Sequence, residues 1–120
     1  MAEKPTILIV EDDEDTRAVL QDLLEMNGYA VRTCADARRA VESAQADPPA
    51  LMLVDYLMPD ADGAWVVRTL RESGVEVPVV VATGSNEGRA AADALGVVSL
   101  EKPFDITRLL ELVKSLVPPA

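Results

Sequence analysis

The stretch TILIVEDDED, residues 6–15, joins an apolar run of strand length to five consecutive acidic residues. A continuous apolar run, without alternation of polar and apolar residues, is typical of a strand buried on both faces of a parallel sheet. A second run, LMLVD at residues 51–55, likewise ends on an acid, Asp55. Adjacent negative charges repel one another, so the acids after the first run need a physical explanation.

Apolar runs alternate with segments of helical periodicity along the whole chain. The pattern predicts strands over 6–10, 29–34, 51–55, 77–83 and 97–101, and helices over 13–26, 36–46, 63–73, 86–95 and 105–117. Buried strands separated by amphipathic helices form parallel sheets with helices on both faces. The sequence therefore predicts an α/β fold and, because it contains no internal linker, a single domain over residues 1–120.

The composition is that of a globular chain. The 120 residues are enough to bury a core of their own, and 49% of them are hydrophobic. The sequence has no apolar run of membrane-spanning length, no signal peptide at its start, and a single cysteine, Cys34, which cannot form an internal disulfide. We expect a cytoplasmic protein in a reducing compartment.

The charge balance and the lack of histidine exclude several classes of function. Eleven basic and 21 acidic residues leave a formal charge of −10, which argues against direct nucleic-acid binding because phosphates would be repelled. Without histidine the chain can hold no histidine metal site, no Ser–His or Cys–His pair and no phosphohistidine of its own. Such an acidic protein recruits cations or binds basic or apolar partner surfaces.

Three acids stand where the first and third predicted strands end. Glu11 and Asp12 directly follow the first of these strands, and Asp55 ends the other. Ligand sites in open parallel sheets form beyond the carboxyl ends of the strands, so these carboxylates converge if the two strands are neighbours. Two carboxylates about 4 Å apart repel by about 4 kcal/mol at an effective dielectric constant of about 20, a cost that a bound cation would offset. Hard oxygen ligands suit Mg²⁺ or Ca²⁺, and a site with few carboxylates plus waters favours Mg²⁺ with a phosphate group. A solvated run of charges is the alternative.

The remaining acids of the run have a simpler explanation. Asp13, Glu14 and Asp15 stand at the start of the first predicted helix, where Asp13 can cap and the helix dipole favours negative charge. A calcium-binding EF-hand loop does not fit, because its glycine and final glutamate are missing from the required positions.

Four sequence strings together resemble one family. They are ILIVEDD (7–13), LMLVDYLMPDADG (51–63), VVVATG (79–84) and EKPF (101–104). Each is weak alone, but in this order and at these separations they resemble the receiver domain of two-component response regulators. The resemblance implies a doubly wound, flavodoxin-like (βα)5 fold of three layers, with a five-stranded parallel sheet of order 2-1-3-4-5.

The resemblance also implies roles for individual residues. Asp55 matches the aspartate that accepts a phosphoryl group from a kinase phosphohistidine, and a plain turn residue is its alternative. Glu11 and Asp12 match the acidic pair that binds Mg²⁺, and the backbone carbonyl of Leu57 matches the third metal contact.

Three further residues match the phosphate-binding positions of the family. Thr83 matches the hydroxyl residue that bonds a phosphoryl oxygen, and Gly84 the small residue that lets a backbone N–H approach it. Lys102 matches the lysine that pairs with the phosphoryl group, and the Lys102-Pro103 bond is expected to be cis. Without the resemblance, Thr83 could be an ordinary strand residue and Lys102 an ordinary surface lysine.

The sequence departs from the family pattern on the output side. Ser99 stands where the family usually has an aromatic residue whose rotamer reports phosphorylation, and the interval from Thr83 to Lys102 is shorter than usual. We expect a shortened fourth helix or loop. Our hypothesis is that phosphorylation still pulls Thr83 inward and that the change is read through residues 84–99.

Three other classes of protein are alternatives to a receiver domain. An aspartyl phosphatase needs a second acid where Leu57 stands, and a flavodoxin needs a hydroxyl- and glycine-rich loop where the acids stand. The third alternative is a receiver-like interaction module that is never phosphorylated. It is not excluded, because Ser99 replaces the aromatic residue that usually reports phosphorylation.

The resemblance implies a sensor histidine kinase or phosphotransfer protein as one partner and a downstream protein as another. It implies no direct binding to nucleic acid or membrane, and it leaves open a dimer that forms on phosphorylation. The chain is either a stand-alone receiver or a piece of a longer regulator.

Overall fold

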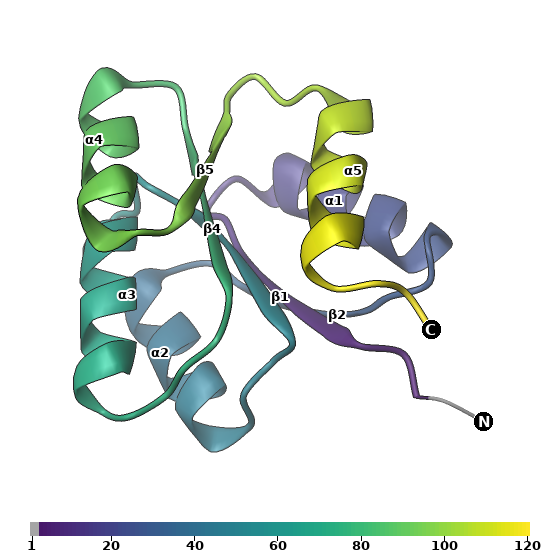
Figure 1. The fold of residues 1–120 in the computed structure, drawn as a ribbon, viewed down its shortest axis with the longest axis horizontal. Helices are drawn as coiled ribbons and strands as arrows, with labels where there is room; N and C mark the ends of the chain where they lie inside the picture. Colours follow the sequence, from purple (N-terminus) through teal and green to yellow (C-terminus); the bar gives the residue numbers. More distant parts are fainter. Residues whose placement is uncertain (1–2) are drawn as a thin grey trace.

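The computed structural model describes residues 3–120, in which strands and helices alternate (Figure 1). The strands are β1 (Thr6–Val10), β2 (Ala30–Cys34), β3 (Leu51–Asp55), β4 (Val79–Thr83) and β5 (Val98–Glu101). The helices are α1 (Glu14–Met26), α2 (Ala37–Ala46), α3 (Gly63–Glu72), α4 (Asn86–Leu95) and α5 (Ile106–Leu116). All strands pair in parallel in the order β2-β1-β3-β4-β5. The expected flavodoxin-like fold and strand order are confirmed.

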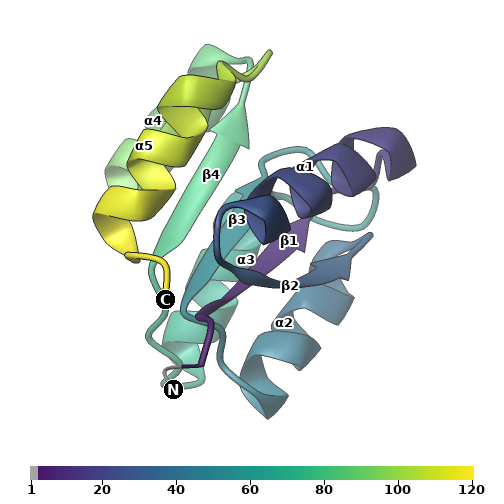
Figure 2. The same cartoon turned by 90° about the vertical axis from the view of Figure 1, so that its right-hand side faces the viewer.

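Helices cover both faces of the sheet and give the fold three layers. Helices α1 and α5 lie on one face, and α2, α3 and α4 lie on the other (Figures 1 and 2). Successive side chains of a strand point to opposite faces, so Ile7 and Ile9 join the core under α1 and α5, while Leu8 and Val10 join the other core. Each such side chain stabilises the fold by about 1.5–3 kcal/mol through burial.

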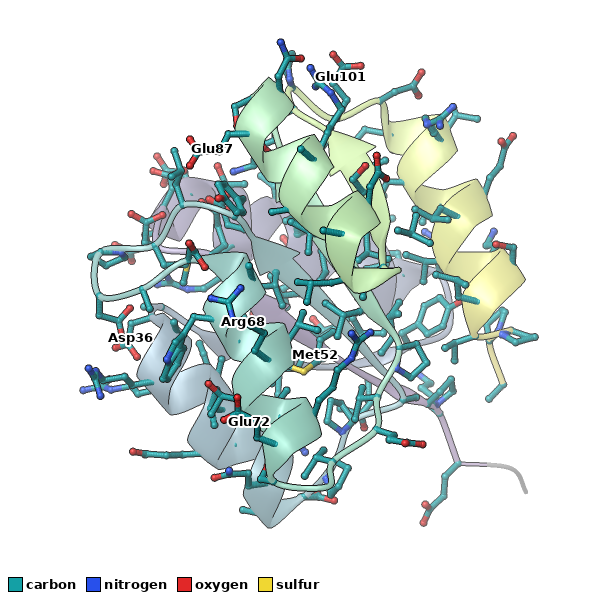
Figure 3. All side chains as sticks on the ribbon, turned by 60° about the vertical axis from the view of Figure 1, so that its left-hand side comes forward. Asp36, Met52, Arg68, Glu72, Glu87 and Glu101 are labelled. Atoms are coloured by element: carbon teal, nitrogen blue, oxygen red, sulfur yellow. The ribbon has the colours of Figure 1, made fainter. Side chains whose placement is uncertain are left out.

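Burial is greatest in the middle of the sheet. Every residue of β3 and β4 is buried, whereas the edge strands β2 and β5 are partly exposed. Figure 3 shows Met52 of β3 beneath α3, whose outer surface carries Arg68 and Glu72. The complete burial of β3 and β4 explains why the runs 51–55 and 79–83 are apolar up to their last residues.

Each helix begins at a side chain that caps its first turn. In every case the capping oxygen accepts a hydrogen bond from the backbone N–H three residues later, which satisfies a group that would otherwise lack a partner. The caps are Asp13, Asp36, Asp62, Ser85 and Asp105.

Several element boundaries differ from prediction by one or two residues. The strand predicted from residue 77 begins at Val79, because Pro78 has no N–H for the sheet ladder. The last helix ends at Leu116, and Val117 is its C-terminal cap. No helix within residues 3–120 is both long enough and apolar enough to cross a membrane.

Candidate functional site

The acidic cluster forms where β1 and β3 end side by side. Val10 pairs with Val54 in the parallel register, so the next residues, Glu11 and Asp55, are neighbours at the carboxyl edge of the sheet. One carboxylate oxygen from each of Glu11, Asp12 and Asp55 lies within 4.8 Å of the others. Strand adjacency, on which the prediction of converging carboxylates depended, is therefore confirmed.

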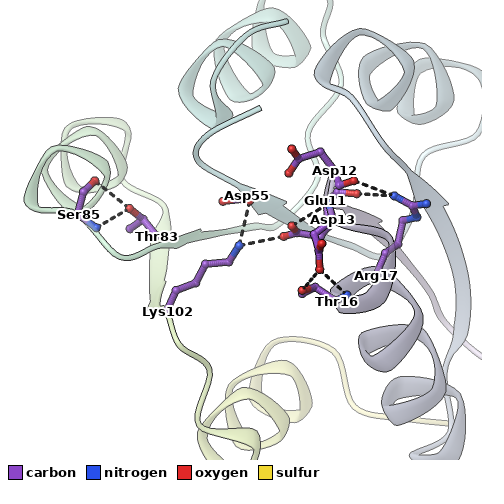
Figure 4. Close-up of polar contacts among 9 residues, drawn as sticks. All are labelled: Glu11, Asp12, Asp13, Thr16, Arg17, Asp55, Thr83, Ser85 and Lys102. Atoms are coloured by element: carbon purple, nitrogen blue, oxygen red, sulfur yellow. Dashed lines mark hydrogen bonds and ion pairs between the residues drawn. The ribbon is translucent and has the colours of Figure 1, made fainter. Parts of the chain in front are cut away.

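Lys102 lies between two of these carboxylates. Its Nζ donates hydrogen bonds to Oε2 of Glu11 at 3.0 Å and to Oδ2 of Asp55 at 2.9 Å (Figure 4). Lys102 reaches this place because it follows β5 and its backbone N–H bonds the carbonyl of Thr83 on β4. The Lys102-Pro103 bond is cis, as expected. The ammonium offsets the repulsion between two buried acids.

Burial and charge shift the protonation of this cluster. Burial raises the pKa of Glu11, and the Asp55 charge adds to that effect, while the hydrogen bond from Lys102 opposes it. Burial disfavours the charged form of Lys102, but its hydrogen bonds to Asp55 and Glu11 outweigh that effect and raise its pKa. Three convergent carboxylates beside one lysine are a donor set that suits Mg²⁺.

Arg17 fixes the backbone of the acidic pair. Its Nη1 donates a hydrogen bond of 2.9 Å to the carbonyl of Glu11 and a longer one of 3.5 Å to that of Asp12 (Figure 4). Sequence reasoning missed Arg17. The available signal was a cation in the first turn of a helix, where the dipole disfavours positive charge.

The run of five acids has two parts, as predicted: acids of the cluster and acids at the start of α1. Asp13 accepts hydrogen bonds from the N–H of Thr16 at 2.9 Å and from its hydroxyl at 2.5 Å. These bonds stabilise the ionised form and lower the pKa of Asp13. Asp13 is therefore a helix cap, while Glu11 and Asp12 face the cluster.

The loop after β3 is tied to α2 by Asp60. Its two carboxylate oxygens each accept a hydrogen bond of 3.0 Å, one from the N–H of Ala37 and one from that of Arg38. The same loop carries Leu57, a residue that is 70% exposed beside the cluster. Sequence reasoning missed Asp60, because only the folded chain shows that 60 and 37 are neighbours.

We expect Asp60→Ala to weaken Mg²⁺ binding several-fold, because the loop that holds the Leu57 carbonyl loses its anchor on α2. Asp105→Ala is the matched control, since it removes the cap of α5 away from the loop. Both variants should lower the urea midpoint, and calorimetry should find weaker Mg²⁺ binding in Asp60→Ala alone. Equal Mg²⁺ affinity in the two variants would contradict the positioning of Leu57 by Asp60.

The remaining predicted residues line one small cavity beside the cluster. The cavity has a volume of about 220 Å³ and is lined by Asp55, Tyr56, Leu57, Thr83, Gly84, Ser85 and Lys102. Thr83 is buried at the end of β4, and its hydroxyl faces Ser85 (Figure 4). All seven predicted site residues thus lie at one edge of the sheet. The four charged ones form the cluster, and Leu57, Thr83 and Gly84 line the cavity beside it.

The departures on the output side are also visible. Ser99 lies on β5 in grooves next to α5, outside the cavity described above. The short interval between Thr83 and Lys102 reflects a tight connection, because α4 begins at Asn86 and has ten residues. Shortening of this region relative to the family pattern stays a prediction.

Comparison with known sequences agrees with the geometry. Residues 7–114 match the response regulator receiver domain family. The response regulator MprA of Mycolicibacterium vanbaalenii is 36% identical over 113 residues, which cover 92% of this chain and 49% of that protein. MprA of Mycobacterium leprae is also 36% identical, with 92% and 50% covered. The chain spans about half the length of these curated relatives.

Solved structures give the same result. The chemotaxis protein CheY4 of Vibrio cholerae superposes with a TM-score of 0.86 at 28% identity, covering 96% of this chain and all of the other. The receiver domain of the Francisella response regulator 1452 gives a TM-score of 0.86 at 25% identity, covering 93% and 95%. With its fold, its acidic cluster and these similarities, the chain belongs to the response regulator receiver domain family of two-component signalling.

Proposed function

We propose that Asp55 is the phosphoacceptor of this receiver domain. A carboxylate oxygen of Asp55 attacks phosphorus, a P–O bond forms, and the bond from phosphorus to the donor's leaving group breaks. The donor is a phosphohistidine, whose imidazole nitrogen leaves, or a small acyl phosphate, whose carboxylate leaves. The observation that carries the proposal is that Asp55 lies close to both an acidic pair and a lysine.

The acidic pair fits a divalent cation. Glu11 and Asp12, with Asp55 and the backbone carbonyl of Leu57, would hold Mg²⁺, since their carboxylates already converge within 4.8 Å. When bound, Mg²⁺ neutralises charge on the incoming phosphoryl oxygens. Arg17 and Asp60 keep the two ligand-bearing loops in place through the backbone contacts described above.

The other site residues act on the phosphoryl group itself. The Lys102 ammonium, which bonds Glu11 and Asp55 in the free protein, pairs with a phosphoryl oxygen through a charge-assisted hydrogen bond. The hydroxyl of Thr83 donates to a second oxygen, and the backbone N–H of Gly84 approaches the group because no side chain blocks it.

The partners follow from the chemistry of the donor. We propose one receiver domain over residues 1–120 that is phosphorylated in the cytoplasm by a sensor histidine kinase or phosphotransfer protein, and that then changes its contacts with a downstream protein. Dimerisation of the phosphorylated form belongs to the same proposal. The formal charge of −10 supports protein partners over nucleic acid.

The proposal is tested with a phosphodonor that needs no kinase. Incubation with acetyl phosphate and Mg²⁺ should add one phosphoryl group to the protein, measured by intact mass spectrometry, and chelation of Mg²⁺ should prevent it. An unchanged mass with Mg²⁺ present would contradict the proposal.

Mg²⁺ binding should weaken on acidification at a higher pH than is usual for glutamate ligands. The raised pKa of Glu11 means that the folded protein protonates this carboxylate while ordinary glutamates are still ionised, and protons then compete with the metal. Calorimetric titrations across a pH series should show the decline. In Glu11→Gln the pH dependence should shrink and the affinity should be low throughout; an unchanged pH profile would contradict this prediction.

A further inference from the structure

Another cavity lies at the end of β4 opposite Thr83. It has a volume of about 480 Å³, which is within the range of sites that hold small organic molecules. Its walls are the end of α3, the segment that leads from α3 into β4, and the residue before β5. Most of the lining is aliphatic: Val67, Leu70, Val75, Val77, Val79 and Val97. The cavity therefore favours a ligand with an apolar body.

The aliphatic lining belongs to the core that α2, α3 and α4 cover. Val67, Leu70 and Val79 are buried members of that core, so they are held firmly in place. Val75 and Val97 are only partly buried and pack against the same core. An apolar ligand in the cavity would remove more of their surface from water, which is favourable.

Arg71 supplies positive charge at this cavity and has no partner of its own. Within residues 3–120, no carboxylate oxygen lies within 4.0 Å of its guanidinium, whereas Arg38 and Arg39 on α2 both pair with acids. The backbone N–H groups of Glu76 and Val77, which also line the cavity, donate no hydrogen bond to another described residue. A free cation and free donors together suit a negatively charged acceptor.

Arg71 is not needed to complete the end of α3. A basic residue in the last turn of a helix can bond the final carbonyls, which otherwise lack partners. Here the carbonyls of residues 69–71 already accept hydrogen bonds from the N–H groups of Ser73, Val75 and Gly74. The guanidinium of Arg71 is therefore available to a ligand.

Glu76 does not cancel the charge of Arg71. Burial alternates from Val75 to Val79, with Glu76 and Pro78 exposed between valines that face the core. This is the alternation of an extended segment, so the Glu76 carboxylate points away from the aliphatic lining.

We propose that the cavity binds an apolar monocarboxylate, a short alkyl or aryl chain with one terminal carboxylate. The chain fills the aliphatic lining, and the carboxylate pairs with Arg71, whose planar guanidinium suits two parallel hydrogen bonds to a carboxylate. The proposal does not depend on phosphorylation of Asp55, because the cavity and the phosphoacceptor site lie at opposite ends of β4.

Three probes with the same apolar body separate charge from apolar contact: 4-phenylbutyrate, 4-phenylbutanol and 4-phenylbutylamine. Amide NMR spectra of the full chain should show saturable shifts at Val75, Val77 and Val97 on addition of the carboxylate. It should bind roughly two- to fivefold more tightly than the alcohol, and the amine should bind most weakly. Nonspecific attraction to a chain of net charge −10 would favour the amine, so this order identifies a specific anion site.

Two results of these titrations would overturn the proposal. One is the absence of saturable shifts at the three valines, including the case in which the carboxylate shifts Lys102 in their place. The other is binding of the carboxylate no tighter than that of the alcohol or the amine.

Arg71→Gln isolates the contribution of the ion pair. The affinity for the carboxylate should fall to that for the alcohol, while the affinity for the alcohol should not change. Arg68→Gln is the matched control, since it removes the same charge from the outer surface of α3, away from the cavity lining (Figure 3). It should bind all three probes like the wild type. Wild-type affinity for the carboxylate in Arg71→Gln would overturn the proposal.

Val97→Phe tests the cavity itself. The larger ring should occupy the space that the probes need, so the saturable shifts caused by both the carboxylate and the alcohol should disappear. In folded Val97→Phe protein, unchanged binding of both probes would overturn the proposal. If this variant does not fold, the exposed Arg71→Gln change and the order of the three probes decide the question.

Discussion

Asp55→Asn should abolish phosphorylation by acetyl phosphate, leaving no mass gain where the wild type gains one phosphoryl group. Asparagine has nearly the same shape, so it retains the position beside Glu11 and Lys102, but its neutral amide is a poor nucleophile. The effect should be all-or-none because, of the two carboxylates that Lys102 bonds, Asp55 is the one that lines the cavity with Thr83. Intact mass spectrometry after incubation with Mg²⁺ measures it.

The matched control is Asp93→Asn, an exposed acid on α4 away from the cluster. It changes the net charge by the same amount and should be phosphorylated like the wild type. A phosphoryl group on Asp55→Asn at wild-type yield would show that the acceptor is another residue.

Lys102→Met should bind Mg²⁺ more tightly and yet accept phosphate more slowly. In the free protein the ammonium bonds both Glu11 and Asp55, so it competes with a metal for their carboxylates, and its removal ends that competition. In the transfer step the same ammonium stabilises phosphoryl oxygens through a charge-assisted bond of about 1.5–3 kcal/mol, so its loss should slow the reaction roughly 10- to 150-fold.

The opposite signs of these two effects separate a direct role from unfolding. A destabilised site would bind Mg²⁺ more weakly and also be phosphorylated more slowly. Loss of the Lys102 cation alone should raise the Mg²⁺ affinity and lower the rate of phosphorylation. Lys114→Met on α5 is the control for general loss of positive charge and should change neither. Unchanged Mg²⁺ affinity in Lys102→Met would mean that the lysine does not compete at the metal site.

The sequence predicted the site best where acidic residues stand at the ends of predicted buried strands. The apolar runs at 6–10 and 51–55 predict buried parallel strands, and the acids that follow them converge once the strands are neighbours. Lys102 could be placed only through the resemblance carried by EKPF, because a lysine 91 residues from Glu11 has no local signal that pairs the two.

Other contacts depend on how elements pack and could not be read from the sequence. Asp60 is an ordinary loop acid until α2 is placed against the loop, and Gly88 is an ordinary helix glycine until α4 is placed on Thr83. Adjacent apolar residues of one helix also differ in burial: Leu20 of α1 is buried, whereas Val19 is 59% exposed. Adjacent helix positions lie about 100° apart, so Leu20 and Leu24 face the sheet with the half-buried Leu23 beside them, while Val19 points away.

The most direct test is chemical location of the phosphoryl group. Sodium borohydride reduces an aspartyl phosphate to homoserine, so protein treated with acetyl phosphate and Mg²⁺ can be reduced, digested and mapped by peptide mass spectrometry. We predict homoserine at position 55 and at no other aspartate. Phosphate that survives reduction on the hydroxyl of Thr83 or Ser85, or homoserine at Asp12 in place of Asp55, would contradict the assignment.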